Sequence, residues 1–226
     1  MMRIEALDTP EGIAAAGHSR LYRLLADGFS YPDGESFDAL KTGEFRNYAM
    51  ATCGDLPYDL EPVFDGLVAS GTYTDFQAEY LRIFEVGLGV PPCPLYSGLF
   101  RGGRKAVMEE LARFYSYFGL SIEHGSGELP DHITTELEFM HFLAFKELAA
   151  LDQQKDPEPY RRAQADFLER QLTNWLPDLE KRLQGLEPPP FYAALAWLTN
   201  TAARAHLAAL DGSLDRNVSI SLEQVR

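Results

Sequence analysis

Apolar residues along this chain recur mainly every three or four positions, which is the spacing of one face of an α-helix. Near the start of the chain, the residues with this spacing are Leu21, Leu24, Leu25 and Gly28. The Thr-Pro-Glu sequence at residues 9–11 supplies an N-cap residue, a proline suited to the first helical turn and an acid there. The pattern therefore predicts a helix that starts after residue 9 and runs to about Phe29.

Further segments with helical spacing follow, separated by glycine and proline. They cover residues 37–48 with an interruption at 43, then 60–68, 74–84, 107–118, 131–151, 160–176 and 191–209. No stretch alternates apolar and polar residues over more than a few positions, so strands are not expected. We predict an all-α chain, a single-domain bundle of about eight helices over residues 1–210, with a flexible tail over 211–226.

The composition is that of a globular protein with an acidic charge balance. Of 226 residues, 46% are hydrophobic and 24% are charged, and the formal net charge is −14. These fractions exclude a wholly disordered chain. The acidity argues against binding to nucleic acid, whose phosphates need clustered lysine and arginine, and against anionic membrane surfaces. A basic peptide or protein is the partner that this charge favours.

Cysteine usage and the first residues indicate a reducing cytoplasm. Cys53 and Cys93 form neither a Cys-x-x-Cys pair nor a cluster with histidine, so we expect no disulfide and no zinc site. Residues 1–10 lack the basic and apolar regions of a secretory signal. No run of 18 apolar residues occurs, so membrane insertion is not expected either.

Two irregular segments interrupt the helical pattern, residues 86–97 and 125–132. The first is rich in glycine and proline, yet it carries Leu88, Val90 and Leu95, which cannot all be buried in a tight turn. Long irregular segments in compact domains are often functional, and a groove for an apolar or mixed peptide is one use for these side chains. The alternative is that they pack against the bundle, which composition alone favours.

A metal-dependent enzyme is the second class of function to consider. Glu138 and His141 have the Glu-x-x-His spacing that puts both side chains on one helix face, and His132 with Glu136 offers a further pair. Di-iron bundles need two such motifs, whereas this chain has one. An exposed polar helix face explains these residues more simply, so we predict no catalytic residue, no metal and no other cofactor. Nucleophile-elbow, dinucleotide-loop and Walker sequences are also missing.

Two short stretches carry a more specific signal. One begins at Tyr80, passes Phe84 and continues as Pro-Pro-Cys-Pro-Leu-Tyr-Ser at residues 91–97. The other is Glu-Leu-Pro-Asp-His at residues 128–132, followed by Glu-Leu-Glu-Phe-Met at 136–140. Together with the all-α context, their order and spacing resemble the TorD/DmsD/NarJ family of redox-enzyme maturation chaperones, over most of the chain.

The resemblance implies a cytoplasmic chaperone, monomeric or dimeric, and not an enzyme. Members of this family bind the catalytic subunit of a molybdenum enzyme before its cofactor is inserted. Many also bind its twin-arginine signal peptide and hold back export, and the charge of −14 suits such a basic peptide. The residues that the resemblance assigns to client and signal-peptide binding are Tyr80, Phe84, Pro94, Leu95, Tyr96, Glu128, Pro130, Asp131 and His132.

One departure from the family pattern concerns the client. TorD and DmsD relatives commonly carry Glu-Pro-x-Asp-His, whereas the proline here stands one place later, at Pro130. This variant looks more like the chaperones of nitrate-reductase-like, type II molybdoenzymes. A trimethylamine oxide or dimethyl sulfoxide reductase client is therefore put in doubt, and export of the client stays open.

The Asp131–His132 pair also has a physical interpretation. Pro130 disfavours helix at the residue before it, so Asp131 can cap a helix that begins with His132. His132 can then donate hydrogen bonds to a peptide or titrate near neutral pH. The alternatives are that Asp131 is only a structural cap, or that the pair is a general-base dyad of an enzyme.

Overall fold

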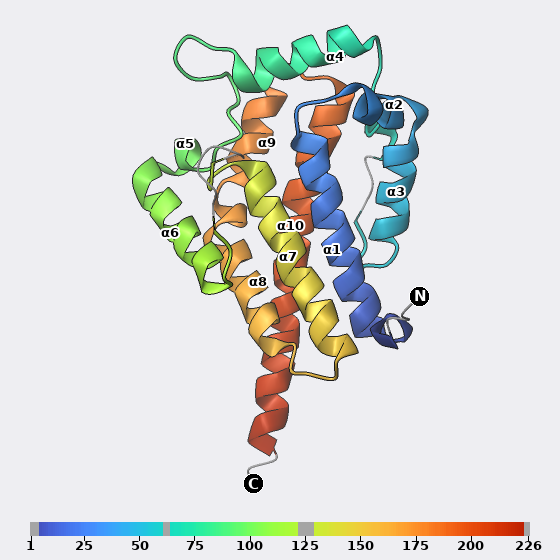
Figure 1. The fold of residues 1–226 in the computed structure, drawn as a ribbon, viewed down its shortest axis with the longest axis vertical. Coiled ribbons are helices and arrows are strands. Elements are labelled where there is room, and N and C mark those ends of the chain that lie inside the picture. The colour runs from blue at the N-terminus through green and yellow to red at the C-terminus, as the bar shows by residue number, and fades with distance from the viewer. Residues whose placement is uncertain (1–4, 61–63, 122–128, 224–226) are drawn as a thin grey trace.

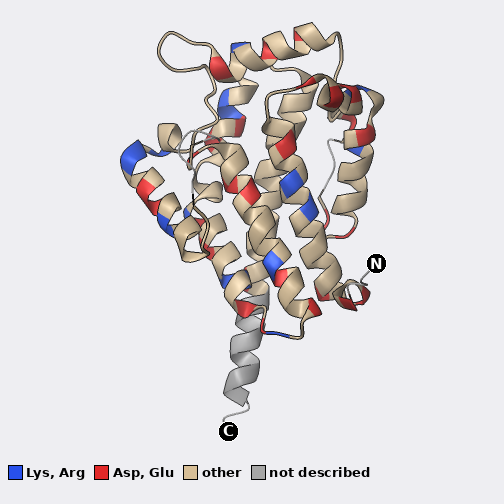
Figure 2. Cartoon of the chain, in the orientation of Figure 1, with Lys and Arg blue, Asp and Glu red and all other residues tan. Residues whose placement is uncertain are grey.

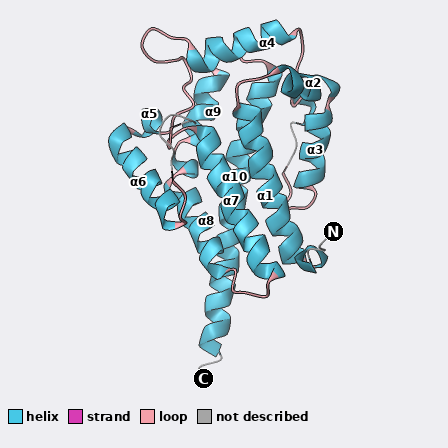
Figure 3. Cartoon of the chain, in the orientation of Figure 1, coloured by secondary structure: helices cyan, strands magenta, loops and turns pink. Residues whose placement is uncertain are grey.

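The computed structural model describes residues 5–60, 64–121 and 129–223, with side chains described as far as residue 212. Helices dominate these ranges, and no strand is formed within them (Figure 3). The prediction of an all-α fold is confirmed. Within the same ranges, no helix is both long and apolar enough to cross a bilayer.

Three long helices form the centre of the molecule: α1 Pro10–Phe29, α7 Ile133–Asp152 and α10 Pro190–Glu223. Helices α1 and α7 lie side by side in opposite directions, with α10 behind them (Figure 1). As predicted, α1 begins after Thr9, whose Oγ1 accepts a hydrogen bond of 3.1 Å from the backbone N–H of Gly12.

Shorter helices surround this centre. Their bounds are η1 Glu5–Asp8, α2 Gly34–Thr42, α3 Glu44–Cys53, η2 Phe64–Gly66, α4 Tyr73–Tyr80, η3 Leu81–Glu85, α5 Gly98–Arg101, α6 Arg104–Tyr117, α8 Glu158–Arg170, η4 Leu172–Asn174 and α9 Leu176–Gln184. Figure 1 shows α2 and α3 beside α1, α6 on the opposite side, and α4 across one end of the bundle. The 86–90 segment protrudes at this same end.

Two boundaries differ from the helical periodicity. The apolar stripe at residues 60–68 predicts a helix, but its described part contains only the single turn η2, although Leu60 and Leu67 are buried. Pro57 and Gly66 disfavour a continuous helix here, so Leu60 and Leu67 reach the core from irregular backbone. The segment predicted as one helix over 160–176 ends instead at Arg170, and Pro177 lies in the first turn of α9.

The helix predicted over 74–84 also starts earlier than expected. Helix α4 begins at Tyr73, after a capping box at Thr72. The Thr72 Oγ1 accepts from the backbone N–H of Asp75 at 3.2 Å, and the Asp75 carboxylate accepts from the Thr72 N–H at 3.3 Å. Asp75 lies three residues after Thr72, which is the spacing that a reciprocal box needs.

Most buried apolar side chains belong to one large, strongly aromatic cluster, and a small separate cluster lies around Ala15 and Leu148. The largest fully buried side chains include Trp175, Tyr22, Tyr192, Phe29, Phe84 and Phe167. The bounds of α10 include much of the segment expected to be a tail. Because side chains beyond residue 212 lie outside the description, the domain boundary at 210 stays a prediction.

Two buried histidines join α1 to α10. The rings of His18 and His206 stack with centroids 3.6 Å apart and planes 10° apart. His18 shares a hydrogen bond of 3.0 Å with the hydroxyl of Tyr58, and His206 shares one of 3.0 Å with the hydroxyl of Tyr22. Burial lowers the pKa of His18 to about 3, so this pair is neutral and structural at physiological pH.

Candidate functional site

The two motif stretches, separated by residues 98–127 in the sequence, meet in the structure. The backbone N–H of Ser97 donates to the carbonyl of Asp131 at 2.8 Å, and the N–H of Ile133 donates to the carbonyl of Leu95 at 2.8 Å. These two bonds form an isolated antiparallel bridge at the start of α7. The loop before α5 is thereby fixed to the loop before α7.

Asp131 is the charged residue at this junction, and it is fully buried. Its carboxylate accepts two hydrogen bonds from Arg104 at the start of α6, from Nε at 2.9 Å and from Nη2 at 3.4 Å. Arg104 remains about a third exposed, at 37%. The expectation that Asp131 caps α7 is therefore wrong. The N-cap position belongs to His132, which makes no side-chain capping bond, and Asp131 instead ties α7 to α6.

His132 is also buried, at 3% exposure. Its Nδ1 shares a hydrogen bond of 2.7 Å with Thr134 Oγ1, and its ring meets Tyr96 edge-on at 4.9 Å. The guanidinium of Arg104 lies over the ring of this same Tyr96, 4.9 Å from the ring centroid. Burial lowers the pKa of His132 to about 4 in spite of the nearby Asp131 charge, so titration near neutral pH is not expected here.

Most of the remaining predicted site residues that the structure describes are buried behind this junction. Tyr80 and Phe84 are 2% and 1% exposed and pack edge-on at 5.1 Å. The Tyr80 hydroxyl donates to the carbonyl of Phe29 at 3.1 Å, which joins α4 to the end of α1. The residues Pro94, Leu95 and Pro130 are buried, Tyr96 is half-buried, and Glu128 lies outside the described residues.

The apolar surface near the site is the 86–90 loop, hereafter the apolar loop. Val86, Leu88 and Val90 are 63%, 109% and 50% exposed, and Figure 2 shows the protruding loop without charged residues. As expected, the three aliphatic residues singled out in this segment are not all buried: Leu95 is buried, whereas Leu88 and Val90 are not.

The apolar loop is held in a defined shape. A Cβ on Gly87 would lie 2.2 Å from the carbonyl oxygen of Val90, and Gly89 has a φ of +94°. At the base of the loop, the N–H of Cys93 donates to the carbonyl of Ile83 at 2.9 Å, and Arg182 Nε donates to the carbonyl of Pro92 at 2.6 Å. Glycine is thus required at the tip, and the base is fixed to η3 and α9.

A buried carboxyl lies one turn into α7. Glu136 is fully buried, and its Oε2 accepts a hydrogen bond of 3.1 Å from Trp175 Nε1. Burial raises the pKa of Glu136 to about 8, against smaller lowering effects of Ser97, Trp175 and Arg101. The other oxygen, Oε1, and the nearby Ser97 Oγ have no hydrogen-bond partner. A neutral Glu136 at physiological pH fits this apolar position.

The sequence motifs do not point to the roles of Arg104 and Glu136. Glu136 lies three residues after Ile133 and four before Met140, both of which are buried, so helical spacing already put it on the inner face of α7. The pairing of Arg104 with Asp131, across 27 residues, has no comparable signal in one sequence.

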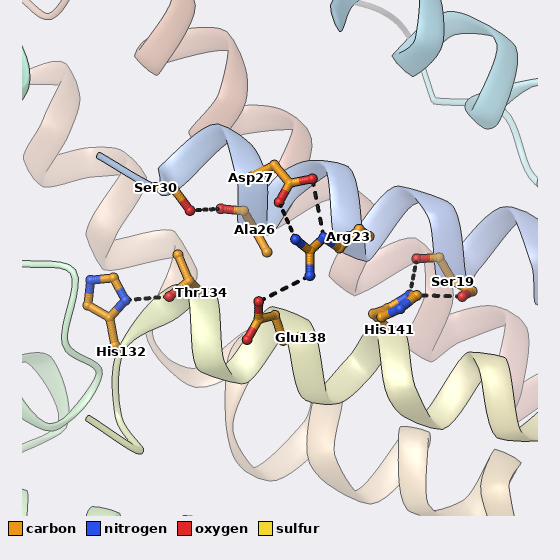
Figure 4. Close-up of polar contacts among 9 residues, drawn as sticks. All are labelled: Ser19, Arg23, Ala26, Asp27, Ser30, His132, Thr134, Glu138 and His141. Atoms are coloured by element: carbon orange, nitrogen blue, oxygen red, sulfur yellow. Dashed lines mark hydrogen bonds and ion pairs between the residues drawn. The ribbon is translucent and has the colours of Figure 1, made fainter. Parts of the chain in front are cut away.

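The four residues of the metal alternative do not converge. Figure 4 shows His132 facing Thr134 and His141 facing Ser19, which its Nδ1 contacts at 2.9 Å. The exposed Glu138 pairs with Arg23, with 3.3 Å between Oε1 and Nη1. Glu136 points to Trp175 instead. Among the described residues, no group of three or more His, Cys, Asp or Glu side chains is arranged to hold a metal ion.

The junction and the apolar loop both lie within the part of the chain that matches a known family. The model of the family described as "Nitrate reductase delta subunit" matches residues 60–180. The chain is 37% identical over 196 residues to the perchlorate reductase assembly chaperone protein of Dechloromonas aromatica, covering 84% of this chain and 88% of that protein.

Two further relatives have similar names. The selenate reductase assembly chaperone protein of Thauera selenatis is 34% identical, and the chlorate reductase assembly chaperone protein of Ideonella dechloratans is 36% identical. Each alignment covers 80% of this chain and 81% of the relative. With a family match over more than half of its length, this chain belongs to the TorD/NarJ family of redox-enzyme maturation proteins.

Proposed function

We propose that this chain is a cytoplasmic, system-specific chaperone that binds the apo catalytic subunit of a molybdenum-cofactor oxidoreductase. It holds the subunit for cofactor insertion and assembly, and it binds the twin-arginine signal peptide until export is allowed. The names of the three relatives, assembly chaperones for perchlorate, selenate and chlorate reductases, support a client of this reductase class. The chain itself carries out no reaction.

The observation that carries the proposal is the apolar loop on its fixed base. A fully exposed Leu88 between two largely exposed valines is costly in water unless a partner covers it. The loop is already ordered by its glycine turn and its anchoring bonds, so binding loses little conformational freedom. An apolar segment of the client is the partner that these side chains fit.

The residues assigned from the family resemblance take two roles in this proposal. Half-buried Tyr96, with Arg104 over its ring, contacts the client at the edge of the junction. The buried set acts indirectly, because it fixes the backbone on which the apolar loop and Tyr96 stand. This set comprises Tyr80, Phe84, Pro94, Leu95, Pro130, Asp131 and His132. Glu128 keeps its place as a proposed contact residue.

Co-purification from the source cells tests this function. Tagged chain would be recovered from anaerobically grown cells, and enriched proteins would be identified by mass spectrometry. We expect a molybdoenzyme catalytic subunit. Its recovery should fall at least tenfold with the double variant Leu88→Gln, Val90→Gln, since glutamine removes apolar contact without adding charge.

Met50→Gln is the matched control, because Met50 is 48% exposed on α3, away from the apolar loop. It should recover the subunit as well as the unmodified chain does. Absence of any molybdoenzyme subunit, against a tag-only preparation, would contradict the proposed function. Equal recovery by the double variant would remove the apolar loop from the binding surface.

A further inference from the structure

One surface beside the apolar loop is basic, although the chain as a whole is acidic. Residues 86–108 contain no aspartate or glutamate, whereas Arg101, Arg104 and Lys105 lie among them. The formal net charge of the whole chain is −14. Figure 2 shows basic positions at the start of α6 and on α9. The positive charge is therefore local, in the stretch that leads on from the apolar loop.

Arg101, at the end of α5, is held by a neutral partner. Its Nη1 donates to the side-chain oxygen of Gln171. The charge of Glu136 would reach Arg101, but burial raises the pKa of Glu136 to about 8, so this acid is protonated at physiological pH. Arg101 is half-buried, and none of its guanidinium nitrogens is buried without a hydrogen-bond partner. The nitrogens that Gln171 leaves unused are thus accessible to a ligand.

Arg182, on α9, is held in the same way. Its Nε donates to the carbonyl of Pro92 at 2.6 Å, and its guanidinium lies 5.5 Å from the centroid of the Phe100 ring. Arg182 is exposed. Within the described ranges, neither Arg101 nor Arg182 forms an ion pair, even with Asp178, one helical turn before Arg182. Uncharged groups thus fix both guanidinium groups, and their charges remain available to a partner.

The two other cations of this region differ from each other. Arg104 is neutralised by Asp131, so it adds no net charge. The Lys105 side chain is 91% exposed, and its Nζ lies 3.8 Å from the exposed Glu109 carboxylate, which makes only a weak pair. We therefore define the basic surface as Arg101, Lys105 and Arg182.

The basic surface adjoins apolar groups. Leu99 on α5 is 36% exposed, and Phe100 packs against Trp175 with ring centroids 5.4 Å apart. Pro92, which accepts the hydrogen bond from Arg182, lies at the base of the apolar loop. Helix α5, α9 and the loop lie at the same end of the molecule (Figure 1). One bound segment can therefore contact the basic surface and the apolar loop together.

We propose that the basic surface binds an acidic segment of the client polypeptide, whose neighbouring apolar residues lie on the apolar loop. Carboxylates accept charge-assisted hydrogen bonds from guanidinium groups, and Arg101 and Arg182 each keep N–H donors for them. A basic segment would be repelled here, because like charges across an interface are costly. The inference rests on the proposed function, since it specifies the chemistry of one client segment.

Fluorescence anisotropy with synthetic peptides tests the basic surface. The probe is a labelled peptide of about 15 residues, in which a run of glutamates follows a stretch of leucine and valine. Its control carries glutamine in place of every glutamate, which keeps the shape but removes the charge. We expect the unmodified chain to bind the glutamate peptide about fivefold more tightly, the combined effect of two ordinary exposed ion pairs.

Two double variants assign this preference to the arginines. Arg101→Gln with Arg182→Gln should abolish most of the preference for the glutamate peptide. Arg101→Lys with Arg182→Lys should retain most of it, because lysine keeps the charge but not the fork that contacts Gln171 and Pro92. A purely structural role of these arginines would be lost in both double variants.

Further variants control for net charge and for folding. Arg113→Gln with Lys155→Gln removes the same charge from two exposed residues elsewhere and should leave the preference within twofold. Lys105→Gln changes a side chain that contacts only Glu109, so it should lower the preference without lowering the melting temperature. This single variant keeps the test decisive if Arg101→Gln with Arg182→Gln does not fold.

Two results would overturn the inference. One is equal affinity of the unmodified chain for the two peptides. The other is a preference for the glutamate peptide that survives both Arg101→Gln with Arg182→Gln and Lys105→Gln. If the catalytic subunit still co-purifies in either case, the basic surface is wrong and the proposed function stands.

Discussion

Arg104 and Asp131 join the start of α6 to the start of α7 through a carboxylate that is fully shielded from solvent. The Nε–Oδ2 distance is 2.9 Å, and a second contact from Nη2 makes the pair bidentate. Asp131 also belongs to the backbone bridge that joins the two motif stretches, because its carbonyl accepts from the N–H of Ser97. The position of Tyr96, and of the chain leading into it, therefore depends on this salt bridge.

Removing the arginine should be costly. Arg104→Ala leaves Asp131 buried without its counter-charge. We expect the free energy of unfolding to fall by about 3 kcal/mol. This is near the low end of the range for broken buried ion pairs, because Arg104 is partly exposed. Arg104→Ala with Asp131→Asn should recover part of this loss. Urea denaturation of the two single variants and the double variant measures the coupling. Additive losses would show that the two side chains do not act as a pair.

Gly98 tests how closely α5 approaches the same pair. A Cβ there would lie 2.6 Å from Arg104 Cγ and 2.9 Å from Asp131 Oδ2. Gly98→Ala should therefore lower stability by about 2 kcal/mol, the range for overpacking in a core. Gly34→Ala is the control, because a Cβ at Gly34 meets nothing within 4 Å. A thermal melt of Gly98→Ala that matches that of the control would show that this approach is not tight.

Glu136 should make stability depend on pH. Its carboxyl has a pKa of about 8 when folded and an ordinary value of 4.5, so the folded state holds the proton more tightly than the unfolded chain. Unfolding releases this proton between pH 4.5 and 8, so stability should fall as pH rises across that window. The loss is on the order of 5 kcal/mol, at about 1.4 kcal/mol for each pKa unit between these two values.

Glu136→Gln keeps an acceptor for Trp175 and removes the titration. The variant should therefore show a flatter stability profile, and it should be more stable than the unmodified chain at pH 8.5. Denaturant titrations at pH 5, 7 and 8.5 measure both profiles. Parallel profiles for the two proteins would mean that Glu136 does not carry a raised pKa.

Binding of a basic signal peptide should depend on salt more than on the protonation of His132. The net charge of −14 attracts such a peptide over distances that salt shortens to about 8 Å at physiological ionic strength. Added salt should slow association more than it speeds dissociation, while apolar contacts retain part of the affinity. Surface plasmon resonance would follow both rates, and a salt-independent on-rate would remove the electrostatic contribution.

The pH arm of the same experiment examines His132 directly. Because burial lowers its pKa to about 4, His132 stays neutral from pH 8 to about pH 5.5, and its protonation cannot weaken binding in that range. His132→Gln should therefore leave the pH profile of binding unchanged there. A profile that flattens only in this variant would show that His132 titrates near neutrality after all.

The sequence predicts the helices well but not the contacts between them. The start of α1 at Thr9, the break at Gly43 and the buried face around Leu21 were all predicted correctly. Each depends on a local feature: a cap residue, a left-handed glycine or amphipathic spacing. The short motifs also identify two segments that meet. Their spacing could not show that Asp131 pairs with Arg104, since that contact depends on how α6 packs against α7.

Burial explains why the candidate site differed most from expectation. Tyr80, Phe84, Leu95 and His132 belong to the motif stretches and are all buried, so they shape the backbone rather than contact a partner directly. A single sequence does not separate these two reasons. The solvent exposure of each side chain in the structure separates them. It shifts the proposed contact surface toward the apolar loop and Tyr96.

We propose that this chain prepares a catalytic subunit to receive its molybdenum cofactor. The most direct measurement is the molybdenum content of that subunit, purified from cells that produce it with the unmodified chain, with the Leu88→Gln, Val90→Gln variant, or with neither. We expect about one molybdenum per subunit with the unmodified chain and several times less in the other two preparations. Equal molybdenum content in all three would contradict it.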